Sequence, residues 1–116
     1  MIKFRAWDNR YKEYIKNVMV DGRGKVYFDD GVATQDDLDI HVEQFTGLTD
    51  VNGKEIYIGD IVKYRNLDEK YQYLKIRWLQ QDCMVDAGGY RIDIVARRCE
   101  VIGNVHENPE LLEVDK

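Results

Sequence analysis

The sequence is poor in the residues on which several protein classes depend. Its 116 residues include two cysteines, two histidines and one proline. Two cysteines build neither a disulfide framework nor a Cys-rich zinc site. No apolar run reaches the ~18 residues of a membrane span, and residues 1–5 lack the apolar core of a secretory signal. We therefore expect a cytoplasmic protein with no membrane contact.

The charge balance and the apolar content set further limits. There are 17 Lys and Arg against 22 Asp and Glu, a net charge of −5, which argues against a protein that coats DNA. Hydrophobic residues make up 44% of the chain, enough for one modest core. We expect a single domain over residues 1–116, with an alternative division into a β-hairpin subdomain 1–45 and a barrel 46–116.

Strands are predicted by residue type and by alternation. The chain has eight tyrosines and many Val and Ile residues, which favour β-structure. Apolar and polar residues alternate at residues 2–6, 74–78, 83–86 and 92–96, which indicates strands with one buried face. The predicted buried positions include Leu74, Ile76, Trp78, Cys83, Val85, Ile92, Ile94 and Ala96.

Turn signals separate these runs at short intervals. They occur at residues 8–10, 21–24, 30–31, 50–53 and 88–89. Asn52-Gly53 is the strongest, and it predicts a type I′ hairpin turn in which both residues have positive φ. Strands at this spacing, without long helices between them, predict a mainly β fold of antiparallel meanders.

Two segments carry helical signals. In residues 34–45 the spacing of Leu38, Val42 and Phe45 fits a helix, but β-branched residues favour a strand from about Ile40 onward. At the C-terminus, Asn108 and Pro109 predict the N-cap and the first residue of a short helix. Leu111 and Leu112 would anchor that helix, and the Asn108 side-chain oxygen would cap it.

Charge is distributed unevenly along the chain. Residues 1–25 carry seven basic and three acidic side chains, a net charge of +4. Residues 26–60 carry one basic and nine acidic side chains, a net charge of −8. This asymmetry fits two solvated faces of a β-protein, or a surface that orients a partner or a second copy of the chain.

No pattern of catalytic or metal-ligating residues stands out. His41 lies between Asp39 and Glu43, but the opposite phase of that strand is apolar, so this row is expected to face solvent. Cys83 and Cys99 are expected to be buried free thiols. Aspartates at 29, 30, 36, 37 and 39 lack the spacing of a calcium loop. We predict no catalytic residue, cofactor or metal, and keep an enzyme with a dispersed Asp/His/Cys site as an alternative.

Aromatic and basic residues interleave in two places. These residues are the candidate interaction surface, and they are Tyr11, Lys12, Tyr14, Lys16, Tyr71 and Tyr73, the last two on a strand with Lys75 and Arg77. Small β-barrels stack nucleobases on such residues. Tyrosine is also enriched in the cores of protein interfaces. We favour a protein partner or a second copy of the chain, with nucleic-acid binding as the alternative.

Three blocks of sequence carry a family pattern. They are MIKFRAWD at residues 1–8, QFTGLTDVNGKEIYIGDIV at 44–62 and EVIGNVHENPELL at 100–112. In these blocks the chain resembles the YopX family of phage and prophage proteins. It departs from the pattern at Ile58, where the family usually has an acidic residue.

The resemblance implies a mainly β fold and a phage or prophage origin in low-GC Gram-positive bacteria, and it brings no biochemical role with it. Residues 59–62 look like the entry into a strand of a small SH3-like barrel. The motif residues are interpreted as structural, because they suit turns and caps. They are Gly47, Asn52, Gly53, Gly59, Asp60, Gly103, Asn104, Asn108, Pro109 and Leu111. We therefore expect a non-catalytic interaction module that acts in the cytoplasm of a bacterial host.

Overall fold

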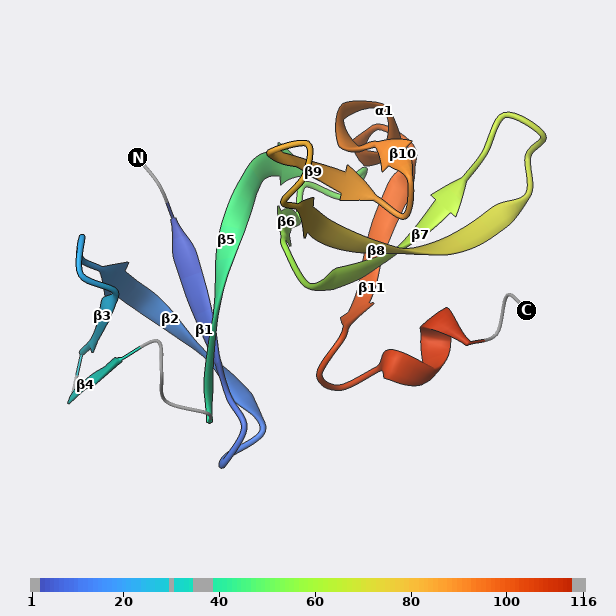
Figure 1. Ribbon diagram of the computed structural model, residues 1–116. Helices are drawn as coiled ribbons and strands as arrows, with labels where there is room; N and C mark the ends of the chain where they lie inside the picture. The colour runs from blue at the N-terminus through green and yellow to red at the C-terminus, as the bar shows by residue number, and fades with distance from the viewer. Residues whose placement is uncertain (1–2, 30, 35–38, 114–116) are drawn as a thin grey trace. The chain divides into compact units, whose positions relative to one another are not determined.

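The structure is a computed structural model that describes residues 3–29, 31–34 and 39–113. The chain divides into two compact units, a first unit Met1–Phe45 and a second unit Thr46–Lys116. Whether they behave as one domain stays a prediction. The elements in Figure 1 are β1 (Phe4–Asp8), β2 (Glu13–Val20), β3 (Lys25–Phe28), β4 (Gly31–Thr34), β5 (Ile40–Thr49), β6 (Glu55–Tyr57), β7 (Asp60–Arg65), β8 (Tyr71–Leu79), β9 (Met84–Ala87), β10 (Tyr90–Arg91), α1 (Ile92–Ala96), β11 (Cys99–Asn104) and η1 (Pro109–Leu112).

The first unit is built on a meander of short strands. In the six-stranded sheet the order is β4-β3-β2-β1-β5-β6, and β5 contains the boundary between the units. β1 pairs antiparallel with β2 and with β5, so it is the central strand of this unit. One face of these strands forms a small core of four buried residues, Ala6, Val18, Val26 and Ile40.

The start of β5 resolves the segment that carried both helical and strand signals. β5 begins at Ile40, which confirms the strand predicted from that residue. Ile40 is buried while His41 is exposed, as alternation requires. Glu43, which was predicted to face solvent in the same row as His41, is buried because it pairs with Arg5. In the sequence, Thr34 and Asp37 also resemble a capping box, and Asp37 lies outside the residues that the structure describes.

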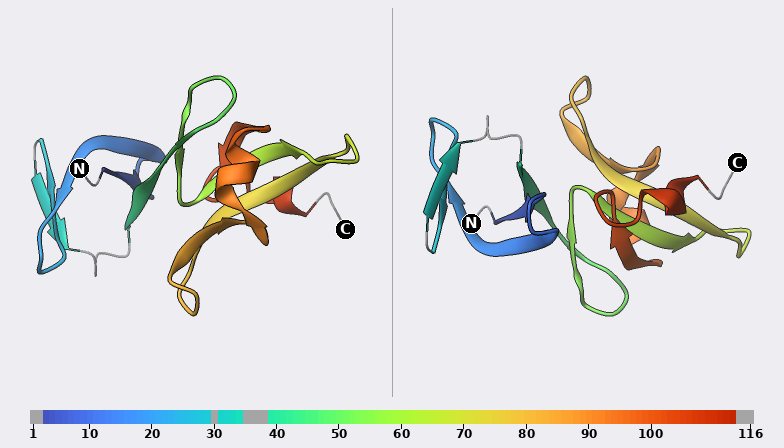
Figure 2. Two further views of the ribbon diagram at one scale, coloured as in Figure 1. Left: turned by 90° about the horizontal axis from the view of Figure 1, so that it is seen from above. Right: turned by 90° about the horizontal axis from the view of Figure 1, so that it is seen from below.

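The second unit contains a five-stranded sheet with the order β10-β9-β8-β7-β11. β8 is its longest strand and lies between β7 and β9, as Figures 1 and 2 show. One face of the sheet packs against α1 and β6, and η1 contacts β8. The buried residues of this core are Ile56, Val62, Tyr64, Leu74, Ile76, Ala87, Val95, Ala96, Cys99 and Val101.

The predicted fold class is confirmed at the level of a mainly β, antiparallel protein. The short C-terminal helix is also present, as a single 3-10 turn at Pro109–Leu112. The strand pairs described here form two sheets and show no closed barrel, so the SH3-like barrel stays a prediction. Within the described residues, no helix has the length and apolar character needed to cross a membrane.

The strand predicted at residues 92–96 is wrong, because these residues form the helix α1. Val95 and Ala96 are both buried and Ile94 is exposed. Neighbouring residues point to opposite faces of a strand, whereas positions 92, 95 and 96 share one side of a helix. Packing of that side on the sheet therefore decides the structure over the local alternation.

Besides Ile94, two further residues predicted to be buried are exposed. Cys83 lies in the turn before β9 with a φ of 49°, so it is outside the alternating strand. Trp78 continues the buried phase of Leu74 and Ile76, but it is 52% exposed. Its partner on β9 is Val85, which is only partly buried. The face of the sheet therefore extends beyond the core at this end.

Candidate functional site

The Asn-Gly motif forms a hairpin loop, but not of the predicted type. Gly53 has a φ of 81° and Asn52 does not have a positive φ. The Gly53 N–H donates to the Asp50 carbonyl (3.0 Å), and the Asp50 N–H donates to the Lys54 carbonyl (2.9 Å). This is the arrangement in which a left-handed glycine follows a tight turn. Only one residue then needs a positive φ, so the type I′ prediction is wrong at Asn52.

Asp50 holds this loop and ties it to β11. Its Oδ1 accepts the N–H groups of Asn52 (2.8 Å) and Lys54 (2.9 Å), and its Oδ2 accepts the buried Val101 N–H (2.9 Å). Burial raises the pKa of Asp50, but these N–H groups outweigh burial and hold the pKa below its ordinary 3.8. The second and third sequence blocks therefore meet at one carboxylate.

The same loop protects part of an exposed sheet edge. β11 is the edge strand of its sheet and pairs only with β7 among the described strands. On its other side, Cys99 accepts a hydrogen bond from the Val51 N–H (3.1 Å), and Val101 donates to Asp50. Unpaired edges invite pairing with other chains. Residues 50–51 thus occupy the place of a neighbouring strand.

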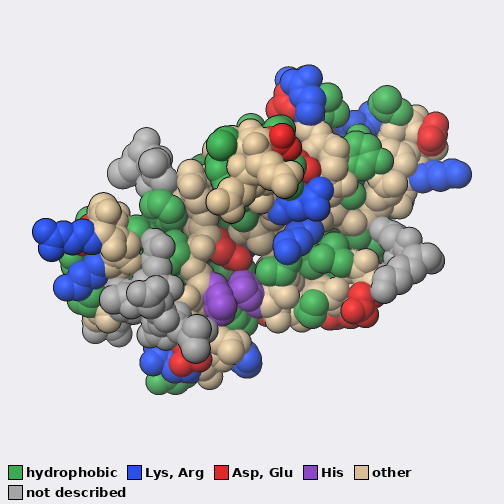
Figure 3. All heavy atoms as spheres, in the orientation of Figure 1, with side chains coloured by type: hydrophobic (Ala, Val, Ile, Leu, Met, Phe, Trp, Pro, Cys, Tyr) green, Lys and Arg blue, Asp and Glu red, His purple; other side chains and the backbone are tan. Residues whose placement is uncertain are grey.

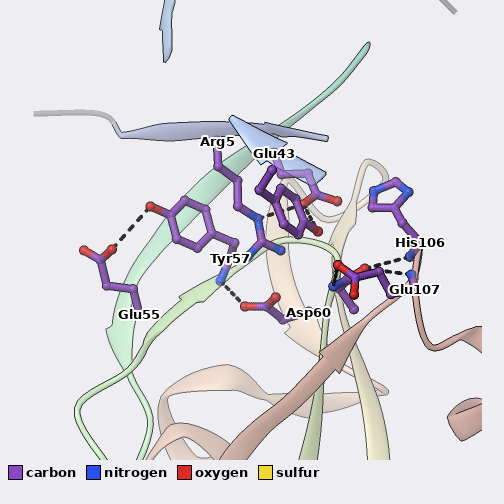
Figure 4. A network of polar contacts seen from close by, with 9 residues as sticks. Arg5, Glu43, Glu55, Tyr57, Asp60, His106 and Glu107 are labelled. Carbon is purple, nitrogen blue, oxygen red and sulfur yellow. Dashed lines mark hydrogen bonds and ion pairs between the residues drawn. The ribbon is translucent and has the colours of Figure 1, made fainter. Parts of the chain in front are cut away.

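Gly59 and Asp60 fix the entry into β7. Gly59 has a φ of 101°, donates to Ile76 (2.8 Å) and accepts from Val105 (2.9 Å). Asp60 is buried, and its Oδ2 accepts the Tyr57 N–H (2.8 Å), as Figure 4 shows. In all of these contacts the partner is a backbone group of the second unit.

The Gly-Asn segment of the third block shapes the turn before η1. The Oδ1 of Asn104 accepts the N–H groups of His106 (3.0 Å) and Glu107 (2.9 Å). A Cβ on Gly103 would lie 2.5 Å from Asn108 Oδ1, so a side chain at position 103 would clash. The Asn108 Oδ1 accepts from the Asn104 N–H (3.3 Å) and makes no helix cap. The predicted capping role of Asn108 is therefore wrong.

The remaining motif residues also have roles in backbone conformation and backbone hydrogen bonding. Gly47 has a φ of 86° with open space around it, so its backbone conformation is what requires glycine. Pro109 begins η1, and the Leu111 N–H donates to the Asn108 carbonyl (3.1 Å). Leu111 is half-buried. None of these contacts presents a reactive group.

Tyr14 belongs to a compact polar cluster in the first unit. Its hydroxyl donates to Glu43 Oε1 (2.9 Å), and Arg5 Nε donates to the same oxygen (2.9 Å). The Arg5 guanidinium lies 4.0 Å from the centre of the Tyr14 ring, and Trp7 packs edge-on at 5.0 Å. Figure 4 shows Arg5 turned toward Glu43. Tyr14 is half-buried and its hydroxyl and ring are engaged in these contacts. It is therefore poorly placed to contact a binding partner.

The other predicted surface residues of the first unit lie near one turn. Tyr11 is 72% exposed. Lys12 is exposed, has a φ of 55°, and donates from Nζ to Asn9 Oδ1 (2.8 Å). The side chain of Lys16 lies outside what the structure describes. The basic and aromatic cluster predicted at residues 11–16 is therefore split by the burial of Tyr14.

The predicted residues of the second unit do share one face. Tyr71 is 58% exposed and Tyr73 is half-buried, both on the solvent-facing phase of β8. Lys63 pairs with Tyr73 across the strands, and its ammonium group lies 4.5 Å from the centre of the Tyr71 ring. Figure 3 shows Lys and Arg side chains beside hydrophobic ones where β8 crosses this unit. The two predicted tyrosines therefore share one face, here together with Lys63, and a role of this face in binding stays a prediction.

A groove of about 520 Å³ opens beside this face. Four of the residues that line it are basic, and they come from β7 and from the segment between α1 and β11: Lys63, Arg65, Arg97 and Arg98. Val51, Glu69, Tyr71, Cys99 and Glu100 complete the lining. The lining of the groove thus carries more basic than acidic side chains, although the chain as a whole is acidic.

Of the residues that line this groove, only Tyr71 was predicted from the sequence to belong to an interaction surface. Its other walls come from residues 51, 63–69 and 97–100, which no local pattern joins. A signal existed in Arg97-Arg98, since these adjacent cations directly precede β11. The pairing of β11 with β7 brings them beside Lys63 and Arg65. That pairing could not be read from spacing alone.

The two cysteines considered for catalysis lie in different surroundings. Cys99 is buried, and burial together with the nearby Asp50 charge raises the pKa of its thiol to about 12. A thiol with this pKa is a weak nucleophile at neutral pH. Cys83 is exposed at a turn. In the described parts of the chain, no three His, Cys, Asp or Glu side chains are grouped so as to hold a metal ion.

Comparison with known proteins decides the family. A family model described as YopX protein matches residues 3–113. The chain belongs to the YopX family. This confirms the resemblance seen in the three sequence blocks. No curated protein matches the chain.

Two solved structures share the YopX fold with it. The crystal structure of protein EF1440 from Enterococcus faecalis matches with a TM-score of 0.74 and 28% identity, over 97% of this chain and 98% of that one. The X-ray structure of protein yopX from Bacillus subtilis matches with a TM-score of 0.60 and 21% identity, over 94% and 96% of the two chains. The similarity to the second protein concerns the fold alone.

Proposed function

We propose that this YopX-family chain is a non-catalytic protein-interaction module. The observation that carries the proposal is the exposed Tyr71 on β8, with the Lys63 ammonium over its ring at 4.5 Å. Tyr and Arg are the residue types that dominate binding energy at interfaces. The motif residues, by contrast, are engaged in turns and backbone contacts, which leaves the solvent face of β7 and β8 for a partner.

The proposal includes a phage or prophage origin and a cytoplasmic location. Support for the location comes from Cys83 and Cys99, which are free thiols, as a reducing compartment allows. We also propose that the second unit is an open relative of an SH3-like barrel. The meander of β7 to β10, with β11 pairing back to β7, supports that comparison.

A capture experiment tests the function. Tagged wild-type protein and the Tyr71→Ala variant are used to capture proteins from phage-infected host cells, with quantitative mass spectrometry as the readout. Tyr11→Ala is the matched control, because it removes another exposed tyrosine, from the first unit, which is 72% exposed against 58% for Tyr71. We expect Tyr71→Ala to lose the partner and Tyr11→Ala to keep it.

Nucleic-acid binding is the second candidate, since a tyrosine with nearby cations also suits base stacking. A gel shift with single-stranded oligonucleotides at low and high salt separates the two functions. A wild-type protein that captures no protein, sediments as a monomer and shifts oligonucleotides in a Tyr71-dependent way would replace the first proposal by the second.

A further inference from the structure

The groove beside β7 and β11 has the chemistry of a site for an acidic segment. Its four basic side chains are set against only two acidic ones, Glu69 and Glu100. The lining is therefore positively charged, in a chain whose net charge is −5. Opposite charge at an interface speeds encounter and selects the partner.

The cations differ in how available they are. Arg98 is held by the chain itself, because its Nε donates to the Arg65 carbonyl (2.8 Å) and its Nη2 to the Asn66 carbonyl (3.2 Å). Arg65 pairs with the exposed Glu69 (2.8 Å), a contact of little strength in water. The Arg97 side chain is exposed and has no hydrogen-bond or ion-pair partner among the described residues. Arg97 is therefore the cation most available to a ligand, and Lys63 is half-buried with its ammonium group 4.5 Å from the centre of the Tyr71 ring.

The groove also offers apolar contact. Val51 and Tyr71 line it, and each is 58% exposed. Val51 is held in place by its N–H bond to Cys99 (3.1 Å). A ligand with an apolar side chain between carboxylates would bury both surfaces while its charges meet Lys63 and Arg97.

Glu69 and Glu100 decide between peptide and nucleic acid. A nucleic-acid strand carries a phosphate at every step, so it must bring negative charge close to both glutamates. A peptide can place its carboxylates beside the cations and backbone N–H groups beside Glu100. The lining therefore favours a peptide.

We propose that this groove binds an acidic, extended segment of a partner protein, with Lys63 and Arg97 contacting its carboxylates and Tyr71 and Val51 its apolar side chain. The proposal rests on the proposed interaction function and names its partner class. It adds to that function a defined binding site and the negative charge of the segment that binds there.

Fluorescence anisotropy tests the proposal directly. The probe is a labelled peptide of Glu residues flanking Phe, and the reference peptide has Lys in place of Glu. We expect the acidic peptide to bind and the basic one not to bind. The double variant Lys63→Glu/Arg97→Glu should weaken binding about tenfold or more, the equivalent of about 1.4 kcal/mol. The tested effect should shrink as salt rises from about 0.05 to about 0.5 M.

The matched control is Arg23→Glu/Lys25→Glu, which changes the net charge equally at exposed residues of the first unit that do not line the groove. It should bind the acidic peptide within about twofold of wild type. Tyr71→Phe should bind like wild type and Tyr71→Ala more weakly. Equal loss in both double variants would overturn the site, since net charge alone would then explain binding.

Two further results separate the proposals. If a partner captured from cells is lost with Tyr71→Ala but kept with Lys63→Glu/Arg97→Glu, the interaction function stands and the acidic-segment proposal is wrong. If oligonucleotides bind more tightly than the acidic peptide and depend on Lys63 and Arg97, the groove is a nucleic-acid site and both proposals are wrong.

Discussion

The turn at Asp21 in the first unit and the turn at Asp50 in the second are the same structure in different surroundings. In each, one carboxylate oxygen accepts the N–H groups two and four residues later, and a glycine three residues later has positive φ. The second oxygen of Asp21 accepts the exposed Tyr27 hydroxyl (3.1 Å), whereas that of Asp50 accepts the buried Val101 N–H. Local sequence makes the turn, and the tertiary partner decides its importance.

A third copy of this turn lies between β7 and β8. Asn66 Oδ1 accepts the N–H groups of Asp68 (2.9 Å) and Lys70 (3.0 Å), and the Glu69 N–H donates to the Asn66 carbonyl (2.9 Å). Here Glu69, and not glycine, has the positive φ, at 60°. The three turns therefore differ in two respects that can be changed separately, namely the anchoring of the first residue and the identity of the fourth.

The largest effect is expected from Asp50→Ala. It removes three hydrogen bonds to a carboxylate and leaves the buried Val101 N–H without its partner. A buried donor that loses a charged partner costs several kcal/mol, so we expect a loss of about 3 kcal/mol in the free energy of unfolding, measured by urea denaturation. Asp21→Ala removes the equivalent local bonds at an exposed turn and should cost clearly less. Equal losses would show that the contact with β11 adds nothing.

The fall of folding stability at low pH gives a second comparison of Asp50 with Asp21. The pKa of Asp50 is depressed in the folded chain by its three N–H donors against the effect of burial. A carboxyl with a depressed folded pKa contributes stability above its unfolded pKa of about 4, and this contribution is lost as pH falls through the folded pKa. Asp50→Asn should therefore flatten the fall in stability below about pH 4.

The Asp21 carboxyl also has a lowered pKa, chiefly through the backbone N–H groups of Lys25 and Arg23. Its Asp21→Asn variant serves as the comparison in the same urea titrations over acid pH. A curve for Asp50→Asn that runs parallel to wild type down to about pH 2 would contradict the linkage argument.

These turns also show how far sequence reasoning reaches. Alternation placed β8 correctly, since Leu74 and Ile76 are buried while Lys75 is exposed. The same pattern failed at residues 92–96, where packing on the sheet selects a helix. The position of the Asn52-Gly53 turn was predictable. Its type depends on the hydrogen bonds of the Asp50 carboxylate, and the Asn-Gly pair alone does not reveal these bonds.

The candidate site illustrates a different limit. Tyr71 was predictable because it is an exposed residue of a recognisable strand. Its groove needs Val51 beside Cys99 and Arg97 beside the edge of β11, and those segments lie far apart in sequence. Long-range strand pairing creates the groove, and local periodicity does not report which strands pair.

A smaller effect is expected at the glycine of the Asp50 turn. A Cβ at Gly53 would meet nothing within 4 Å, so Gly53→Ala tests its φ of 81° alone. A non-glycine residue in the left-handed region costs about 1 kcal/mol, and we expect a loss of that size in urea denaturation. Gly22→Ala is the control, because that position is equally open and does not have a positive φ. It should be neutral or slightly stabilising; a matching loss at Gly22 would refute the backbone explanation.

The smallest effect, and one of opposite sign, is expected from Glu69→Gly in the third turn. Glycine would relieve the positive φ of Glu69, and the gain is offset in part by the greater freedom of glycine in the unfolded chain. The lost ion pair with Arg65 is exposed and worth little. We expect a net stabilisation of about 0.5 kcal/mol, seen as a higher urea midpoint. Glu69→Ala removes the same ion pair but keeps the backbone strain, so it should not stabilise. If Glu69→Ala stabilises as much as Glu69→Gly, the glutamate side chain and not its backbone conformation is the unfavourable element of this turn.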